Sequence, residues 1–295
     1  MPNRPDINAL KKKAAEIRRD VLIATTTAGS GHPGGSMSTC DYAVALYFYK
    51  LRHDPMNPRW DKRDYVFFSH GHINPLIYAL LAHSGYVNRE EYLTTLRKFR
   101  SKFQGHPSAH HCPGIEICSG SLGQGFGVGC GVALSMRRQK KPNRVFVLMG
   151  DGEQQEGSIW EAAFCAAHYK LDNMVAMIDL NGLQIDGKTA DVLNIEPIAD
   201  KYRAFNWHVI EIDGHDMQSC VNALDTAEMV KGKPTIIIAK TVMGKGVKFM
   251  ENDEKWHGSP IGKDKLGASV EELGFDKSHA NVEVYKGHAT DKLTV

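Results

Sequence analysis

Several common sequence signatures are missing from this chain of 295 residues. Its six cysteines include no C-x-x-C pair, which argues against a structural zinc site or a disulfide framework and favours a reducing compartment. The N-terminus has no apolar signal core, and no apolar stretch is long enough to span a bilayer. The formal net charge of +2 creates no field that would attract nucleic acid or a membrane surface. We therefore expect a soluble cytoplasmic protein that binds neither nucleic acid nor membranes.

Familiar phosphate-binding and zinc motifs are absent as well. The glycine-rich run "SGSLGQGFGVGCGVAL" (119–134) is no dinucleotide fingerprint, because its third glycine would fall at Cys130. No G-x-x-x-x-G-K-[ST] and no H-E-x-x-H occur, which excludes an ordinary P-loop and that kind of zinc site. The glycines still favour close approach of the backbone to another group. Near residues 120–122 that group would be a ligand. Near residues 125–131 it would be a neighbouring helix, either within the chain or across a dimer.

What the sequence does contain is an alternation of strand and helix patterns. Continuous apolar, β-branched runs predict strands buried on both faces at 65–69, 144–149, 174–180, 208–213 and 234–241. Helical periodicity predicts helices at 7–28, 73–86, after Asn88, and at 157–169 and 216–230. Such alternation predicts the α/β class, with a mostly parallel sheet and helices on both faces. We expect one domain over residues 1–262, and a peripheral tail over 263–295, where the patterning is weak.

Polar residues and glycines follow the predicted strands, and in a parallel sheet these positions meet at one edge. Asp151 in "MGDGEQQEG" comes directly after one strand, and Asn181 follows the next strand along the chain. A carboxylate and an amide oxygen suit Mg²⁺, and the remaining positive charge suits a diphosphate. Each residue alone is better explained as an ordinary Asp-Gly or Asn-Gly turn. Together, at successive strand ends, they favour a metal site.

Histidines in loops flanked by glycine or proline form a further pattern. His32, His70, His72, His106 and His257 have such surroundings. Neutral imidazoles can both donate and accept protons near neutral pH, so these residues predict a polar pocket for proton transfer and hydroxyl recognition. A catalytic zinc site is the competing explanation.

These motifs together resemble one known family. Gly150-Asp151-Gly152 followed by Asn181 is similar to the thiamine diphosphate signature GDG…N, which alone also fits 2-oxo acid dehydrogenases and decarboxylases. The segments "AGSGHPGGSMS", "FSHGHINPLIYALLAHSGY", "FQGHP", "SGSLGQGFGVGCGVAL", "MGDGEQQEGSIWEA", "YKLDNMVAMIDLNGLQIDG" and "WHGSP" resemble transketolase, in transketolase order, over about residues 10–262. The resemblance implies a thiamine diphosphate-binding fold, and specifically the domain that in this family holds the diphosphate end of the cofactor.

The family's site residues carry over to this sequence. Magnesium, or calcium or manganese in its place, would be bound by Asp151, Asn181 and the carbonyl of Leu183. The residues implied to contact thiamine diphosphate are His72, Gly120, Ser121, Leu122, Asp151, Gly152, Glu156, Asn181, Lys240 and His257. Those implied to be catalytic are His32, His72, His106 and His257. Glu156 resembles an acid that couples two cofactor sites across a dimer. Two positions depart from the family: His70 replaces a common Lys or Asn, and Gly35 replaces a hydroxyl residue found in some members.

The resemblance also implies a partner. The chain is less than half the length of a transketolase and ends soon after "WHGSP", so it resembles the N-terminal subunit of a split transketolase. A second chain would supply the pyrimidine-binding and C-terminal domains, with α2β2 assembly, and the present chain by itself would be inactive. The expected reaction is two-carbon ketol transfer between sugars in the pentose phosphate pathway. Alternatives are a sulfonated or branched sugar substrate, the α subunit of a 2-oxo acid dehydrogenase, or a paralogue that only binds.

Overall fold

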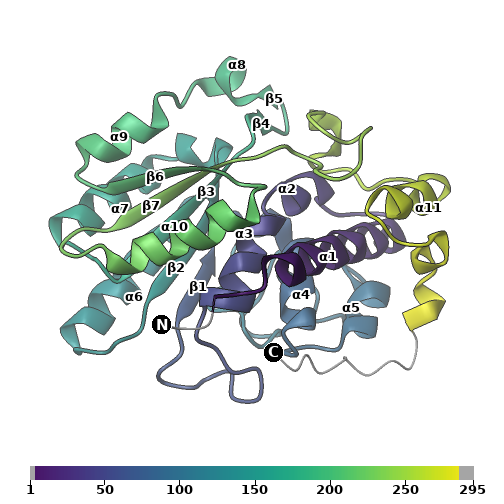
Figure 1. Ribbon diagram of the computed structural model, residues 1–295, viewed down its shortest axis with the longest axis horizontal. Coiled ribbons are helices and arrows are strands. Elements are labelled where there is room, and N and C mark those ends of the chain that lie inside the picture. Colours follow the sequence, from purple (N-terminus) through teal and green to yellow (C-terminus); the bar gives the residue numbers. More distant parts are fainter. Residues whose placement is uncertain (1–3, 286–295) are drawn as a thin grey trace.

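A parallel sheet forms the centre of the computed structural model, which describes residues 4–285 (Figure 1). Its five strands lie in the order β1-β2-β3-β7-β6, and every neighbouring pair is parallel. The strands are β1 (Tyr65–Phe68), β2 (Val145–Gly150), β3 (Met174–Leu180), β6 (His208–Asp213) and β7 (Thr235–Lys240). All five fall where the apolar runs predict them. A separate antiparallel hairpin, β4 (Leu183–Gln184) with β5 (Gly187–Lys188), follows β3 directly.

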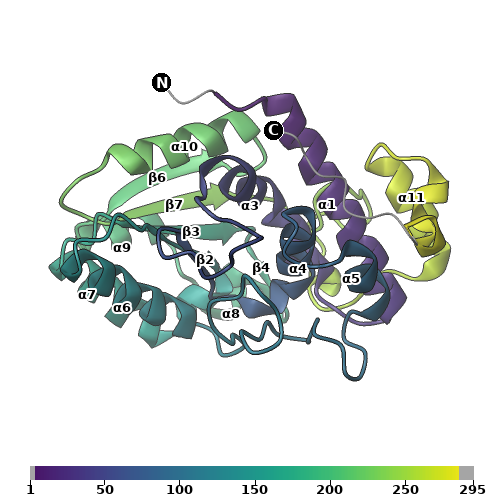
Figure 2. The same ribbon diagram turned by 90° about the horizontal axis from the view of Figure 1, so that it is seen from below.

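Helices cover both faces of this sheet, as expected for the α/β class (Figure 2). The longer helices are α1 (Ile7–Ala28), α4 (Asn74–His83), α6 (Gln124–Arg138), α7 (Gly157–His168), α10 (Met217–Met229) and α11 (Lys263–Glu272). The shorter ones are α2 (Pro33–Ser38), α3 (Cys40–Ala45), α5 (Arg89–Thr95), α8 (Thr189–Leu193) and α9 (Ile198–Ala204). No helix within residues 4–285 is long and apolar enough to cross a membrane.

The sheet divides the interior into two apolar cores because successive side chains of a strand point to opposite faces. On β2, Phe146 and Leu148 belong to the larger core, which α1, α3, α4 and α10 complete. Val145 and Val147 belong to the smaller core, beneath α6, α7 and α9. Burial on both faces explains why these strands are apolar at consecutive positions.

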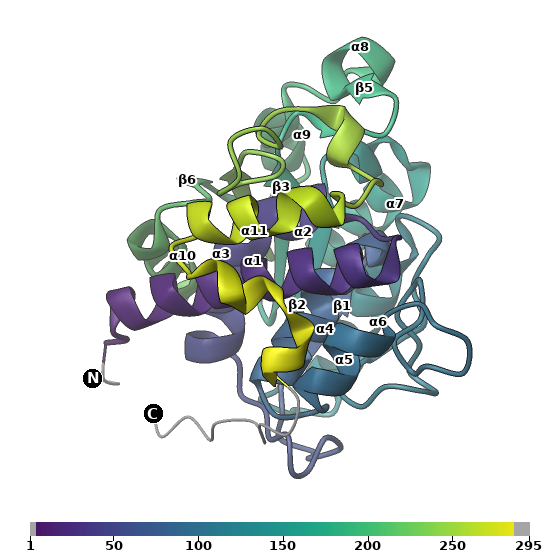
Figure 3. The same ribbon diagram turned by 90° about the vertical axis from the view of Figure 1, so that its right-hand side faces the viewer.

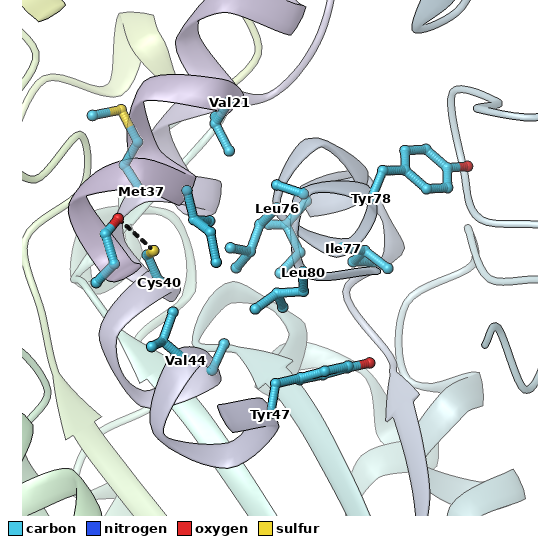
Figure 4. Close-up of a cluster of buried hydrophobic side chains, with 14 of the residues drawn as sticks. Val21, Met37, Cys40, Val44, Tyr47, Leu76, Ile77, Tyr78 and Leu80 are labelled. Atoms are coloured by element: carbon cyan, nitrogen blue, oxygen red, sulfur yellow. Dashed lines mark hydrogen bonds between the residues drawn. The ribbon is translucent and has the colours of Figure 1, made fainter. Parts of the chain in front are cut away.

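The larger core is built where α1, α3 and α4 meet, and Figure 4 shows side chains from all three interlocking. Val21 from α1, Val44 from α3 and Leu76 from α4 have no exposed surface. The Cys40 thiol donates to the carbonyl of Ala14 at 3.4 Å, which satisfies a sulfur in an apolar setting. At the start of α1, the Asp6 carboxylate accepts from two backbone N–H groups and caps the helix. This layer fixes the loop between α1 and α2.

Helix α6 uses its glycines for packing against the sheet. A Cβ atom at Gly125 would lie 2.7 Å from the Ser69 Cα, and one at Gly129 would lie 2.6 Å from a methyl of Val147. Both distances are too short for real atoms, so only glycine lets α6 approach the strands this closely. Gly127 and Gly131 have nothing within 4 Å of that position and lie on the opposite, outward side of the helix.

Residues 263–285 pack beside the N-terminal helix rather than extending away from it (Figure 3). Leu266 and Val270 on α11 are buried in the larger core, and so is Tyr285. The aromatic ring of Tyr285 lies under two guanidinium groups, 5.4 Å from Arg19 and 4.3 Å from Arg89. A domain boundary at residue 262 stays a prediction, and the rest of the predicted tail, 286–295, is outside the described residues.

Candidate active site

A cavity of about 260 Å³ lies at the carboxyl ends of β1, β2 and β3, where the polar loops were expected to meet. Its lining comes from segments far apart in the sequence: the α1–α2 loop, the loops after the three strands, the loop before α6 and the segment after η4 (Glu254–Trp256). The predicted site residues in this lining are His32, His72, Gly120, Leu122, Asp151, Gly152, Asn181, Leu183 and His257.

The two predicted metal ligands with side-chain oxygens are held by short hydrogen bonds. The Asp151 carboxylate is 2% exposed and accepts from the backbone N–H groups of Gly152 at 2.7 Å and Gly182 at 2.6 Å. The Asn181 amide donates to the Asp179 carboxylate at 2.8 Å, and its oxygen accepts from the Leu183 N–H at 2.9 Å. The loops after β2 and β3 are therefore joined at this point.

The acids of the cavity are stabilised by neutral groups. Burial, followed by the nearby charge of Asp179, raises the pKa of Asp151 to about 7. Burial also raises the pKa of Asp179, although Ser38, Thr241 and Asn181 all donate to its carboxylate. Two adjacent buried carboxyls whose protein donors are all uncharged have the electrostatics of a cation site.

No cluster of three or more His, Cys, Asp or Glu residues within 4–285 could hold a metal ion. The predicted site is of another kind, since it combines one carboxylate, one amide oxygen and one backbone carbonyl. Oxygen donors of this type suit Mg²⁺, which keeps several of its ligands as water or phosphate oxygens. The donor set of Asp151, Asn181 and Leu183 therefore fits a magnesium ion that is shared with a diphosphate.

Three histidines of the cavity lining lie close to one another. The ring centroids of His32 and His72 are 5.4 Å apart, those of His72 and His257 are 5.1 Å apart, and those of His32 and His257 are 5.7 Å apart. Burial lowers the pKa of all three, and that of His32 falls to about 4. The rings are therefore neutral at pH 7, each with one N–H donor and one acceptor nitrogen.

Two ring nitrogens of the cavity have unused hydrogen-bonding capacity. His70 is 1% exposed, and its Nδ1 donates to the Leu148 carbonyl at 2.8 Å, which leaves Nε2 buried without a partner. The Nδ1 atom of His257 is likewise buried and unpartnered. Buried polar atoms without protein partners are rare and point to a bound ligand or water. These atoms indicate that the cavity is shaped to hold a polar molecule.

Four predicted residues lie outside the lining of this cavity. Ser121, Glu156, Lys240 and His106 are exposed. The ring of His106 packs against the lining residue Gly120, 3.4 Å from where a Cβ of that glycine would be. Glu156 precedes α7 on the surface, and Lys240 ends β7. Their predicted contacts with a cofactor stay predictions.

The structure also reveals site residues that the sequence reasoning did not select. Glu153 is 2% exposed and joins three loops, accepting from the Ser69 hydroxyl and from the N–H groups of Gly123 and Gly150. Asp179 orients Asn181, and Arg97 contacts His32. Asp179 is an acid within the otherwise apolar strand β3, which is a signal that the sequence offers. Glu153 follows β2 in a polar turn two residues after Asp151, where no such contrast marks it. Nothing in the sequence around Arg97 indicates its contact.

The fold and the cavity define a class of thiamine diphosphate-binding α/β proteins. The family "Transketolase, thiamine diphosphate binding domain" matches residues 10–292, and the chain belongs to it. A solved transketolase from Campylobacter jejuni superposes with a TM-score of 0.89 at 33% identity, covering 96% of this chain but 45% of the larger protein. The chain thus spans less than half of that enzyme.

Shorter relatives match over nearly their full length. A 6-deoxy-6-sulfo-D-fructose transketolase subunit from Clostridium sp. is 40% identical over 264 residues, which is 90% of this chain and 96% of the relative. An apulose-4-phosphate transketolase subunit from Phocaeicola vulgatus is 39% identical over 251 residues, or 85% of this chain and 89% of the relative. Both relatives are named as subunits.

Proposed function

We propose that this chain is the diphosphate-binding subunit of a two-subunit transketolase, which transfers a two-carbon ketol unit from a ketose to an aldose. The observation that carries the proposal is the cavity, which Asp151 and Asn181 line together with the histidines His32, His72 and His257. An oxygen-donor clamp beside neutral imidazoles suits a cofactor that is anchored by its diphosphate and reacts with a polyhydroxylated substrate.

Thiamine diphosphate and Mg²⁺ fit the residues of the cavity. Asp151, Asn181 and the Leu183 carbonyl would hold the metal, with Ca²⁺ or Mn²⁺ as substitutes. Gly152 lines the cavity without a side chain, which leaves room for a phosphate group, while its own N–H is donated to the Asp151 carboxylate. The unpartnered nitrogens of His70 and His257 supply further polar contacts. Gly120, Leu122 and His72 complete the contacts on the opposite side.

When bound, the cofactor supplies the carbon nucleophile and the electron sink for cleavage of the sugar's C–C bond. The chain's own contribution is to orient the reactants and to move protons between oxygens. His32, His72 and His257 are neutral and half-buried, so their N–H groups can stabilise negative charge that develops on a sugar oxygen. We expect His106, beside Gly120 at the surface, to contact the sugar farther from the reacting carbon.

The partner in this proposal is a chain that carries the pyrimidine-binding and C-terminal domains. Support comes from the relatives of similar length, which are named as transketolase subunits. We expect an α2β2 assembly in which two copies of this chain meet through α6 and α7. On that outward face Gly127 and Gly131 leave open space, Val128 is 42% exposed and Phe164 is 66% exposed. Surfaces of that kind allow close helix–helix contact.

The substrate is a sugar handled in cytoplasmic carbohydrate metabolism. A phosphorylated sugar of the pentose phosphate pathway is the first candidate. The names of the two shorter relatives add a sulfonated sugar and the branched sugar phosphate apulose 4-phosphate as second candidates. A donor screen with the assembled enzyme, using ribose 5-phosphate as acceptor, distinguishes them through the two-carbon product.

The decisive experiment combines this chain with candidate partner chains of about 300 residues that carry a pyrimidine-binding domain. Co-purification followed by a ketol-transfer assay should show activity only for the pair, and only with thiamine diphosphate and a divalent cation. Activity of this chain by itself would contradict the two-subunit proposal. An assembled, cofactor-loaded pair that transfers no ketol unit from any donor would contradict the enzymatic one.

A further inference from the structure

Arg97 reaches the active site from a tight loop that follows α5. Its backbone has a left-handed φ of +58°, which is uncommon for a residue other than glycine, and its N–H donates to the Phe103 carbonyl at 2.8 Å. That hydrogen bond closes the loop over residues 97–103. Residues held in such conformations by their surroundings concentrate at functional sites. Here the conformation turns the Arg97 side chain toward His32.

The Arg97 guanidinium is bound by three acceptors. It donates to the Ser30 hydroxyl at 2.9 Å, to the Gly105 carbonyl at 3.2 Å and to the Nδ1 atom of His32 at 3.2 Å. These contacts join the loop after α5 to the α1–α2 loop and to the segment that leads to His106.

A guanidinium has N–H donors only and keeps its proton in proteins. The atom that receives its hydrogen bond, Nδ1 of His32, must therefore present a lone pair. In a neutral imidazole the proton is then on Nε2, at the other edge of the ring. That edge lies beside Gly258, where a Cβ would be 3.4 Å from Nε2, and the ring lines the cavity.

We propose that Arg97 is a positioning residue that holds His32 as the neutral Nε2–H tautomer, so that His32 offers the cavity a hydrogen-bond donor and not a base. The tautomer follows from contacts within this chain. The use of this donor on a sugar oxygen rests on the function proposed above. This assignment separates His32 from His257, whose Nδ1 has no partner and whose tautomer the protein leaves free.

The groups that face His32 are Arg97 from the loop after α5, His72 after β1, His257 after η4, and His106 before α6. Of these, His257, Arg97 and His106 oppose a second proton on its ring. No carboxylate is among the groups that shift its pKa. Burial, then His257, Arg97 and His106, lower the pKa of His32 to about 4, which agrees with a neutral ring throughout the physiological pH range.

The test is histidine ¹⁵N NMR on the full chain, with His32 assigned through His32→Gln. In the wild type we expect an unprotonated Nδ1 and a protonated Nε2, with no titration between pH 6 and pH 8. In Arg97→Met the ring loses both its donor and a nearby charge. We expect a mixture of tautomers and a rise of the His32 pKa by about one unit or more, as a lost charged contact implies.

Arg100→Met is the matched control, because Arg100 is in the same loop, also has a left-handed φ, at +65°, and is exposed. It should leave the His32 signals unchanged. Ser30→Ala keeps the buried charge but removes one acceptor, and should shift His32 in the same direction by less. A wild-type His32 that is protonated at Nδ1, or an unchanged tautomer in folded Arg97→Met, overturns the proposal.

The assembled enzyme gives a second readout that depends on the proposed function. Arg97→Met should lower kcat more than it raises KM for the ketose, and the acid limb of the kcat profile should move up by about one pH unit, as the His32 pKa does. If the NMR result holds while the assembled enzyme transfers no ketol unit from any donor, the proposed function fails and the tautomer assignment stands. If ketol transfer by Arg97→Met has the wild-type pH profile, the role of His32 as a donor fails.

Discussion

Two groups of buried acids in this protein have opposite electrostatic surroundings. In the helical layer, Asp20 has no exposed surface and accepts from Arg89 at 2.5 Å and from His83 at 2.8 Å. Burial opposes ionisation there, but the hydrogen bonds from Arg89 and His83 move the pKa of Asp20 far below its usual value. At the sheet edge, burial raises the pKa of Asp151 to about 7, because its donors are uncharged backbone groups.

Burial is the same in both regions, so the charge of the partners makes the difference. Asp20 is neutralised by the chain itself, which is the arrangement of a structural ion pair. Asp151 and Asp179 have only neutral donors, so their negative charge is available to an external cation. Substitutions should therefore affect folding in the first region and ligand binding in the second.

The largest effect is expected for Asp20→Ala. The substitution leaves the guanidinium groups of Arg89 and Arg19 without their buried counter-charge. Breaking a buried ion pair from one side costs about 3–5 kcal/mol of the free energy of unfolding. Guanidinium denaturation of the purified chain measures it. A loss below about 1 kcal/mol would show that water or other acids replace Asp20.

Asp151→Ala should instead weaken ligand binding and leave the stability of the chain unchanged. We expect thiamine diphosphate affinity of the assembled enzyme, in the presence of Mg²⁺, to fall by about 100-fold or more, since even residues that only support metal ligands contribute 10–100-fold. The unliganded chain should be as stable as the wild type, because a carboxyl with a raised pKa is removed. Titration calorimetry and thermal denaturation measure the two quantities. Asp191→Ala, at an exposed acid on α8, is the control. Unchanged affinity would contradict the metal assignment.

The pH dependence of stability sharpens the comparison through Glu153. Burial raises its pKa to about 7, above the ordinary value of 4.5, so between these values the folded chain binds more protons than the unfolded chain. Stability contributed by this group therefore falls as the pH rises from about 4.5 to 7. Glu153→Gln removes that dependence. The difference in the free energy of unfolding, Glu153→Gln minus wild type, should rise by about 1–3 kcal/mol as the pH rises from 5 to 8. A constant difference across that range would contradict the raised pKa.

Asp41, in the helical layer, should make a contribution to stability that rises with pH, opposite to that of Glu153. Although burial opposes it, Arg18 and His215 lower the pKa of Asp41 to about 2. Its contribution to stability is present above about 3.8 and is lost as the pH falls toward 2. Asp41→Asn should therefore be less stable than the wild type at pH 6, and the two stabilities should become similar near pH 2. Denaturant titrations at both values measure this gap.

The smallest effect is expected for an exposed ion pair. Lys277 lies 3.1 Å from Glu271, and both side chains are about half exposed or more. Solvent screens such a pair, so Lys277→Met should change the free energy of unfolding by less than about 1 kcal/mol. A larger loss in thermal or denaturant unfolding would mean that residues 263–285 stabilise the chain through their charges as well as through Leu266 and Val270.

Much of the fold could be predicted because the signals are local. Consecutive apolar residues in β2 and β3 indicate burial on both faces, and that pattern predicts a parallel sheet between helices. Asn88 caps α5 through the Glu91 N–H at 2.8 Å, at the start of the helix that is predicted after Asn88. Residues 263–285 were harder to predict, because α11 buries few side chains and its apolar pattern is correspondingly weak.

The candidate site was predictable where a ligand-binding residue sits directly after a strand, as Asp151 and Asn181 do. The sequence by itself determined the strand order along the chain, the chemical types at the strand ends and the resemblance to transketolases. Only the tertiary structure decided which charges neutralise which acids, that Asp179 orients Asn181 and that Arg97 donates to His32. Arg97 and His32 are 65 positions apart in the sequence, and Arg89 and Asp20 are 69 apart. Side-chain direction across such separations depends on packing that no local pattern encodes.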